Sequence, residues 1–162
     1  MLATHTGLPA DLHDVQVWDA DGTAHVVAIA ATTDKGAHLS LLRVEEASFR
    51  AAQGTLPLDE AVVSCALEQH GSLAVLTRRH VLHTVSWRVT DDRLMLDEPH
   101  AVPLRPLEEA RLVYVSPSHL LMVVAVPGDA ERVRASALLW DTDLAAVQAV
   151  REWTAPGARQ RR

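Results

Sequence analysis

Short apolar stretches recur along the chain, separated by residues that favour turns, and this alternation constrains the fold more than any other feature. Most stretches span five to nine residues and are rich in Val, Leu and Thr, a composition typical of β-strands. Between them, pairs such as Asp21-Gly22 and His70-Gly71 tolerate the positive φ angles that tight reversals need. The sequence therefore predicts an all-β fold of many short strands.

We expect nine strands with clear patterns and three with weaker ones. The clear strands are Val15–Trp18, His25–Thr32, His38–Val44, Ala61–Leu67, Ser72–Thr77, His80–Val89, Ala110–Val115, His119–Val126 and Arg134–Trp140. The weaker strands are Ser48–Leu56, Arg93–Leu104 and Ala145–Trp153. A helix is the alternative for Glu45–Gln53 and for Thr142–Trp153, where Asp141 or Thr142 can cap an Ala-rich segment.

Three stretches repeat one pattern: an apolar strand that ends near Trp or Leu, a short acidic turn, and the start of a weaker strand. They are Leu39–Phe49, His83–Leu94 and Ser136–Val147. Leu42, Trp87 and Trp140 take equivalent places in the pattern, 45 and 53 residues apart. We expect these three side chains to be structural anchors of a repeat.

The repeat groups the strands into three four-stranded units, at about residues 14–57, 61–105 and 110–153. An N-terminal extension of residues 1–13 and a basic tail of residues 154–162 flank them. Four strands in 40–50 residues is the period of a propeller blade. Because propellers close with about four to eight blades, the sequence predicts a partial propeller. A β-sandwich or an irregular barrel fits the same strands and is the alternative.

The segment SALLWDTDL, with Trp140-Asp141 at the end of a strand, resembles the Trp-Asp step of WD40 blades. The Gly-His element that often opens such blades is absent as a pair, and His70-Gly71 reverses it. The resemblance covers roughly Asp14–Trp153 and implies a degenerate WD40-like propeller.

A narrower resemblance comes from the order of the later segments. AVVSCALEQHGSLAVLTRRHVLHTVSWRV is followed by a Pro-rich loop and then by a strand, the step Ser118-His119-Leu120, a Val-rich strand and a strand ending in Trp. This order resembles the late blades of nucleolar propeller subunits of the UTP-A (t-UTP) subcomplex of the small-subunit processome. The resemblance implies a scaffold in ribosomal RNA transcription and processing, located in the nucleolus and without catalytic residues. The early blades and the helical C-terminal region of that family are missing, and no functional residue can be carried across.

Candidate catalytic and metal-binding residues do not form a convincing motif. His80 and His83 are three apart, so on a strand their rings point to opposite faces, and Cys65 is the only cysteine. Ser116 or Ser118, His119 and Asp129 make a triad on paper, but a G-x-S-x-G elbow and a phosphate-binding loop are both absent. We predict no catalytic, metal or cofactor site. The alternative is a small all-β enzyme or a ligand-binding domain of unknown substrate.

Charge and targeting features point to protein partners inside the cell. The net charge of −6 disfavours direct nucleic-acid binding, except through the arginines of the tail TAPGARQRR. No apolar run approaches the roughly 20 residues of a membrane helix, and the N-terminus does not resemble a secretory signal. We therefore expect an intracellular chain that contacts other protein subunits of a larger assembly and no membrane.

The chain has four tryptophans against one Tyr and one Phe. Trp18 and Trp153 lie near the two ends of the repeat region and are the expected interface residues. A stack of too few blades leaves an apolar face bare at each end, and large bare apolar faces mark interfaces. The sequence therefore predicts a non-catalytic scaffold that binds other proteins or associates with itself through these faces.

Overall fold

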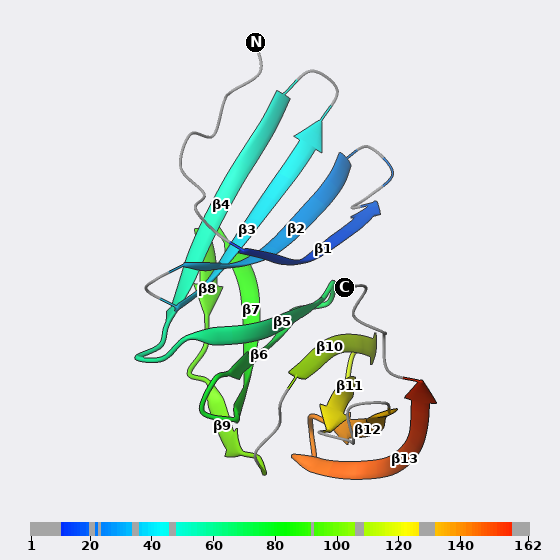
Figure 1. Cartoon of the computed structure of the whole chain (residues 1–162). Helices are drawn as coiled ribbons and strands as arrows, with labels where there is room; N and C mark the ends of the chain where they lie inside the picture. The colour runs from blue at the N-terminus through cyan, green and yellow to red at the C-terminus, as the bar shows by residue number, and fades with distance from the viewer. Residues whose placement is uncertain are drawn as a thin grey trace, which may run out of the picture.

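The computed structural model of the chain describes residues 11–19, 22, 24–33, 36–45, 48–91, 93–105, 109–126 and 132–156, and these residues contain strands and turns but no helix. The strands are β1 (Asp11–Asp19), β2 (Ala24–Thr33), β3 (Gly36–Glu45), β4 (Ser48–Pro57), β5 (Val62–Glu68), β6 (Ser72–Thr77), β7 (Val81–Thr90), β8 (Arg93–Leu96), β9 (His100–Pro103), β10 (Glu109–Ser116), β11 (His119–Val126), β12 (Arg132–Asp141) and β13 (Ala146–Pro156) (Figure 1). Within these residues, no helix could span a membrane.

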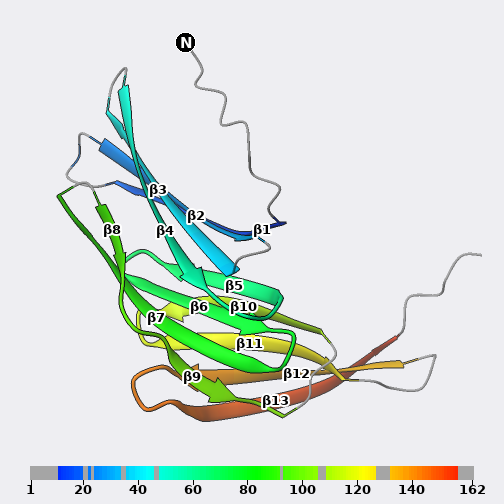
Figure 2. The same cartoon turned by 90° about the vertical axis from the view of Figure 1, so that its left-hand side faces the viewer.

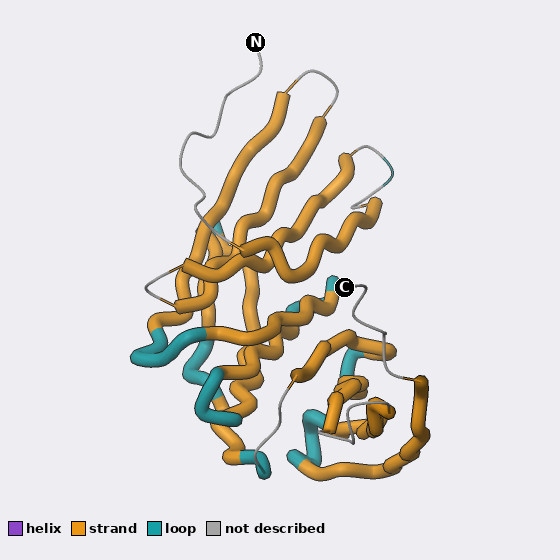
Figure 3. The backbone as a smooth tube through the Cα atoms, viewed as in Figure 1, coloured by secondary structure: helices purple, strands orange, loops and turns teal. Residues whose placement is uncertain are grey.

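The strands form three antiparallel sheets, each made of strands that follow one another in the chain (Figure 3). The N-terminal sheet has the order β1-β2-β3-β4, and the C-terminal sheet has the order β10-β11-β12-β13. The middle sheet has the order β5-β6-β7-β8, and β9 also pairs with β7. The all-β prediction is confirmed. Over the described residues the three sheets stay open and separate, so the strands do not form one closed barrel.

The ends of the strand region lie outside the predicted limits. Strand β1 begins at Asp11, within the segment expected to be an extension, and β13 reaches Pro156, within the segment expected to be a tail. The rest of both segments, including the three arginines of the tail, lies outside the described residues.

The predicted single strand Arg93–Leu104 is wrong, because two shorter strands occupy it. Strand β8 pairs with one end of β7 and β9 pairs with the other. The backbone N–H of Asp97 still donates to the carbonyl of Ser86, at 2.9 Å. Pro99 then interrupts the pairing because it has no N–H to donate. The middle sheet therefore has five strands instead of four.

In both segments for which a helix was the alternative, the described residues form strands, apart from the turn at residues 142–145. Strand β13 pairs with β12 along its whole length, from Ala146 opposite Asp141 to Pro156 opposite Arg132. Asp141 forms the turn that precedes it, because its carboxylate accepts hydrogen bonds from the backbone N–H groups of Asp143 and Leu144, at 2.9 and 3.0 Å. The capped turn and the hydrogen bonds to a neighbouring strand along the whole of β13 outweigh a weak helical pattern.

The middle sheet lies between the other two (Figure 2). It buries side chains on both of its faces. Along β5, Cys65 and Leu67 point towards the N-terminal sheet, where they join Leu39, whereas Ala66 points towards the C-terminal sheet, where it joins Leu120. This is the alternation of a strand with two buried faces. The molecule therefore has two cores, one on each side of the middle sheet.

The first strands of the three sheets lie against one another, with β5 between β1 and β10. Asp14 of β1 accepts a hydrogen bond from the backbone N–H of Leu67 at 2.8 Å, and Ser64 of β5 accepts one from the backbone N–H of Leu112 at 3.4 Å. Each junction between sheets is thus fixed by a side chain that bonds to the backbone of the following sheet.

Gly71 permits the tight turn between β5 and β6. Its φ is +120°, a conformation that side chains rarely adopt, and an added Cβ would lie 2.6 Å from the carbonyl oxygen of Trp87. The carbonyl of Gly71 accepts a hydrogen bond from the backbone N–H of Trp87 at 2.7 Å. The turn and the anchor tryptophan therefore depend on the absence of a side chain at residue 71.

Candidate interaction surfaces

The N-terminal sheet carries an apolar surface on the side turned away from the middle sheet. Side chains there alternate with the core residues Ala28 and Leu39, and the strand register places them next to one another. We name this surface the N-terminal outer face; its apolar residues are Val15, Val17, Val27, Ile29, Leu42 and Val44. Val17 is 63% exposed. Because a sheet face in water is usually polar, the composition of this face resembles that of a sheet face packed in a core.

The C-terminal sheet carries a similar surface on the side turned away from the middle sheet. We name it the C-terminal outer face; its apolar residues are Val113, Leu121, Val123, Leu139 and Trp153, and Val115 follows Val113 at the register shift between Tyr114 and Ser116. Val115 is 56% exposed and Trp153 is 42% exposed. Among the described residues, each end of the stack is therefore an apolar sheet face that no other sheet covers.

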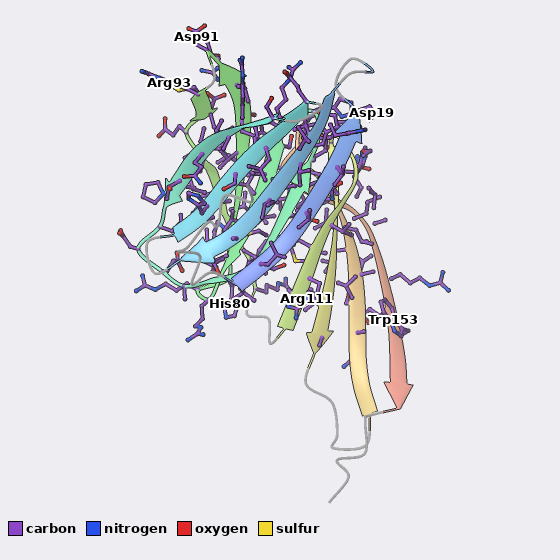
Figure 4. All side chains as sticks on the ribbon, turned by 90° about the horizontal axis from the view of Figure 1, so that it is seen from above. Asp19, His80, Asp91, Arg93, Arg111 and Trp153 are labelled. Carbon is purple, nitrogen blue, oxygen red and sulfur yellow. The ribbon has the colours of Figure 1, made fainter. Side chains whose placement is uncertain are left out.

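Charges differ between the two outer faces. Arg111 lies two residues before Val113, and Arg151 lies two residues before Trp153, so both arginines share the C-terminal outer face with these residues. Asp19 follows Val17 on the N-terminal outer face, where its carboxylate lies 2.5 Å from Nδ1 of His25. Figure 4 shows Asp19 at the end of β1, and Arg111 and Trp153 on the C-terminal sheet.

The three anchor residues predicted from the repeat point in the same direction from their own sheets. Trp87 is buried in the core between the middle and N-terminal sheets, and Trp140 is buried in the core between the C-terminal and middle sheets. Each tryptophan thus packs against the preceding sheet. Leu42 lies on the corresponding face of the N-terminal sheet, where the described residues supply no preceding sheet.

The two tryptophans predicted at an interface lie in different environments. Trp153 is on the C-terminal outer face, whereas Trp18 is half-buried between the N-terminal and middle sheets. The ring of Trp18 lies 6.3 Å from that of Trp87, at an interplanar angle of 39°. Sequence reasoning did not connect these rings. Trp18 ends the first strand of one unit, while Trp87 lies in the third strand of the next.

A groove of about 240 Å³ opens beside the two tryptophans. Its walls include Trp18 and Trp87, with Arg43, Arg50 and Val89. Arg43 also pairs with Glu45, at 2.6 Å. An apolar floor with two guanidinium groups near it can receive a small molecule with an aromatic body and a negative charge.

Two members of the Ser-His-Asp combination considered from the sequence, a serine and His119, lie close together in the β10–β11 hairpin. The Nδ1 atom of His119 lies 2.9 Å from the hydroxyl of Ser116 and 3.2 Å from that of Ser118. Its Nε2 atom lies 3.2 Å from Gln148 and 4.0 Å from the carboxylate of Asp141. Asp129 lies outside the described residues. These contacts join neighbouring strands at a turn, and Asp141 already holds the backbone of the next turn. The arrangement therefore has a structural role that the sequence does not reveal.

Burial shifts the pKa of three titratable side chains in the described part of the chain. Burial, with a smaller effect of Asp14, raises the pKa of Cys65 to about 12. Burial also raises the pKa of Tyr114, whose hydroxyl has no hydrogen-bond partner among the described residues. Within the same residues both ring nitrogens of His83 lack hydrogen-bond partners, and burial lowers its pKa, an effect that the nearby Glu60 opposes. In the described part of the chain, no three His, Cys, Asp or Glu side chains gather where they could hold a metal ion.

Neither the protein-family models nor the curated proteins contain a match to this chain.

Proposed function

We propose that the chain is a non-catalytic scaffold, a protein–protein interaction module that acts through its two outer faces. The observation that carries the proposal is the pair of bare apolar sheets at opposite ends of the stack. Each resembles a sheet face that the molecule buries elsewhere, and contiguous exposed apolar patches of this kind mark protein contacts.

The three sheets are, in this proposal, three blades of an incomplete WD40-like propeller. Three features support it: each sheet is a meander of consecutive strands, the first strands lie side by side, and the anchors Trp87 and Trp140 pack in the same direction. The stack places the outer faces on rigid strands, which suits a surface that holds a partner.

The experiment is site-specific photocrosslinking in cells of the native organism. A photoreactive residue replaces Val17 on one face, Val115 at the end of β10 next to the other, or Leu144, which is 70% exposed in the turn between β12 and β13. We expect crosslinked protein at the first two positions and none at Leu144, with the same partner copurifying with the intact chain. Equal labelling at all three positions, or labelling at none, would refute the interaction module.

The finer proposal is a role in ribosome biogenesis, as a propeller fragment of a nucleolar factor for ribosomal RNA transcription and processing. It rests on the segment order around Ser118-His119-Leu120 and on the three-sheet stack. Affinity purification of the intact chain tests it: small-subunit processome proteins are expected in the eluate. Their complete absence from cells of the native organism, while other partners are recovered, would contradict this role and leave the scaffold intact.

The second candidate function is ligand binding in the groove beside Trp18 and Trp87. The adjacent guanidinium groups of Arg43 and Arg50 favour an anionic aromatic ligand. Titration with anilinonaphthalene sulfonate, followed by its fluorescence, tests this. Trp18→Ala and Arg50→Ala are each expected to weaken binding at least about tenfold, a loss of about 1.4 kcal/mol, and Leu144→Ala to leave it unchanged. Equal binding by all forms would assign the dye to other surfaces and exclude the groove.

A further inference from the structure

We infer that the C-terminal outer face of one copy of this chain covers the N-terminal outer face of a second copy, so that two copies form one closed six-sheet assembly. The inference rests on the proposed function, since it names the partner of the same two faces. It concerns a second copy rather than another protein, and three independent features support that choice.

The first feature is the direction of packing. We call the side of a sheet that contacts the next sheet in the chain its leading side and the opposite side its trailing side. At both junctions a leading side meets a trailing side: Leu39 meets Leu67, and Ala66 meets Leu120. The uncovered surfaces are the leading side of the C-terminal sheet and the trailing side of the N-terminal sheet. These are the two halves of one further junction of the same kind.

The second feature is the unfilled anchor position. Trp87 and Trp140 lie on trailing sides and are buried against a preceding sheet, at 8% and 6% exposure. Leu42 lies on the trailing side of the N-terminal sheet, beside the exposed Val17 and Val44. A C-terminal sheet from a second copy provides Leu42 with the preceding sheet that the other anchors already have.

The third feature is charge. The C-terminal outer face carries Arg111 and Arg151, whereas the N-terminal outer face carries Asp19, whose carboxylate lies next to His25. Pairing unlike faces brings an acid towards the arginines, and pairing two C-terminal outer faces brings four arginines together. Because buried like charges repel strongly, the charges favour the head-to-tail arrangement over the pairing of identical faces.

Closure follows from the number of sheets. A head-to-tail contact either closes into a ring or continues as an open filament. Two copies of three sheets give six, and this number lies within the usual range of about four to eight blades in closed propellers. In such a ring each copy uses both outer faces, so that both apolar surfaces leave water at once.

Sedimentation equilibrium of the purified intact chain tests the inference. We expect a mass of twice the 17.6 kDa of one chain. Val17→Asp and Val115→Asp each place a carboxylate in an apolar junction and are expected to weaken association at least about a hundredfold. Leu144→Asp is the matched control and is expected to leave the mass unchanged. Circular dichroism and a thermal melt of each variant verify that the sheets remain folded.

Mixing the two face variants separates the possible arrangements. Val17→Asp retains an intact C-terminal outer face and Val115→Asp retains an intact N-terminal outer face, so the mixture is expected to form a two-chain species that neither forms alone. Charge exchange is a second route: Asp19→Arg or Arg111→Asp weakens association, and the double variant regains it.

Three results would overturn the inference. They are a mass of one chain at high concentration, a two-chain species that survives Val115→Asp, and a series of species larger than two chains. The first of these leaves the proposed scaffold standing if Val17 and Val115 still crosslink to another protein. The absence of both self-association and such crosslinks rejects the scaffold as well.

Discussion

The middle sheet and the two end sheets have the same meander of consecutive strands and differ in what covers them. In the middle sheet, both Leu67 and Ala66 of β5 are buried, at 1% and 0% exposure. In β1 of the N-terminal sheet, Val17 is 63% exposed although its residue type would suit a core. A strand that is apolar on both faces is typical of a sheet with a neighbouring sheet on each side. Strand β1 has this pattern, although the described residues supply a neighbour on one side only.

The largest expected effect comes from truncating a residue of the middle sheet. Leu67→Ala is expected to lower the free energy of unfolding by about 2–5 kcal/mol, because the site is fully buried and cannot collapse easily. Val17→Ala, at the exposed site, is expected to cost about 0.5 kcal/mol or less in dilute solution. Urea denaturation measures both. Equal costs at the two sites in dilute solution would contradict the contrast between the sheets.

A smaller effect is expected for the turn that positions Trp87. Gly71→Ala forces a side chain into a positive φ and against a carbonyl oxygen, and we expect a loss of about 1–3 kcal/mol. Gly22→Ala is the control, because its φ of +74° is also positive but no atom lies within 4 Å of the added Cβ. Thermal melts should therefore show a greater loss at Gly71, and similar losses at both would remove the close approach as the cause.

The junctions between sheets come next. Asp14→Ala removes the acceptor of the Leu67 N–H and is expected to cost about 1–2 kcal/mol. Ser64→Ala, at the longer bond of 3.4 Å to Leu112, is expected to cost less. Hydrogen exchange at the amides of Leu67 and Leu112 measures each junction separately. Unchanged exchange at Leu67 in Asp14→Ala would show that packing alone holds the first junction.

The smallest effect is a pH dependence carried by His83 in the core beside the N-terminal sheet. Burial lowers its pKa in the folded protein, so the unfolded chain binds the proton more readily. Stability is therefore full above the unfolded value of about 6.5 and falls as the pH drops below it. His83→Leu is expected to flatten the melting temperature in this range. An unchanged slope would assign the dependence to other groups.

The alternation of apolar and turn residues was enough to predict strands, because β propensity and turn chemistry act locally. The split between β8 and β9 was missed because Pro99 blocks only one backbone donor, and the pairing on either side depends on where β7 ends. The register that buries Trp87 while leaving Leu42 only partly buried is set by contacts between sheets, which one strand's sequence does not encode.

The outer faces were predictable in kind and not in detail. Counting three units implied bare ends, and Trp153 does lie on one of them. Trp18 lies instead against Trp87, a contact that joins positions 69 residues apart and depends on how two sheets stack. The groove beside these rings was not anticipated, since Arg43 and Arg50 come from adjacent strands and meet the tryptophans only in the folded stack.

The arrangement of each sheet from consecutive strands also has a consequence for synthesis on the ribosome. A nascent chain that has emerged as far as Leu58 holds all four strands of its first sheet, but Leu39 and Leu41 lack the residues of the middle sheet that cover them, and Asp14 lacks the N–H of Leu67. We therefore expect protease resistance of the N-terminal sheet to rise only when β5 to β7 have emerged, which pulse proteolysis of stalled chains can detect. Until then the growing polypeptide displays apolar surface on both sides of the N-terminal sheet. A chaperone would therefore have most to protect between the emergence of the N-terminal sheet and that of the middle sheet.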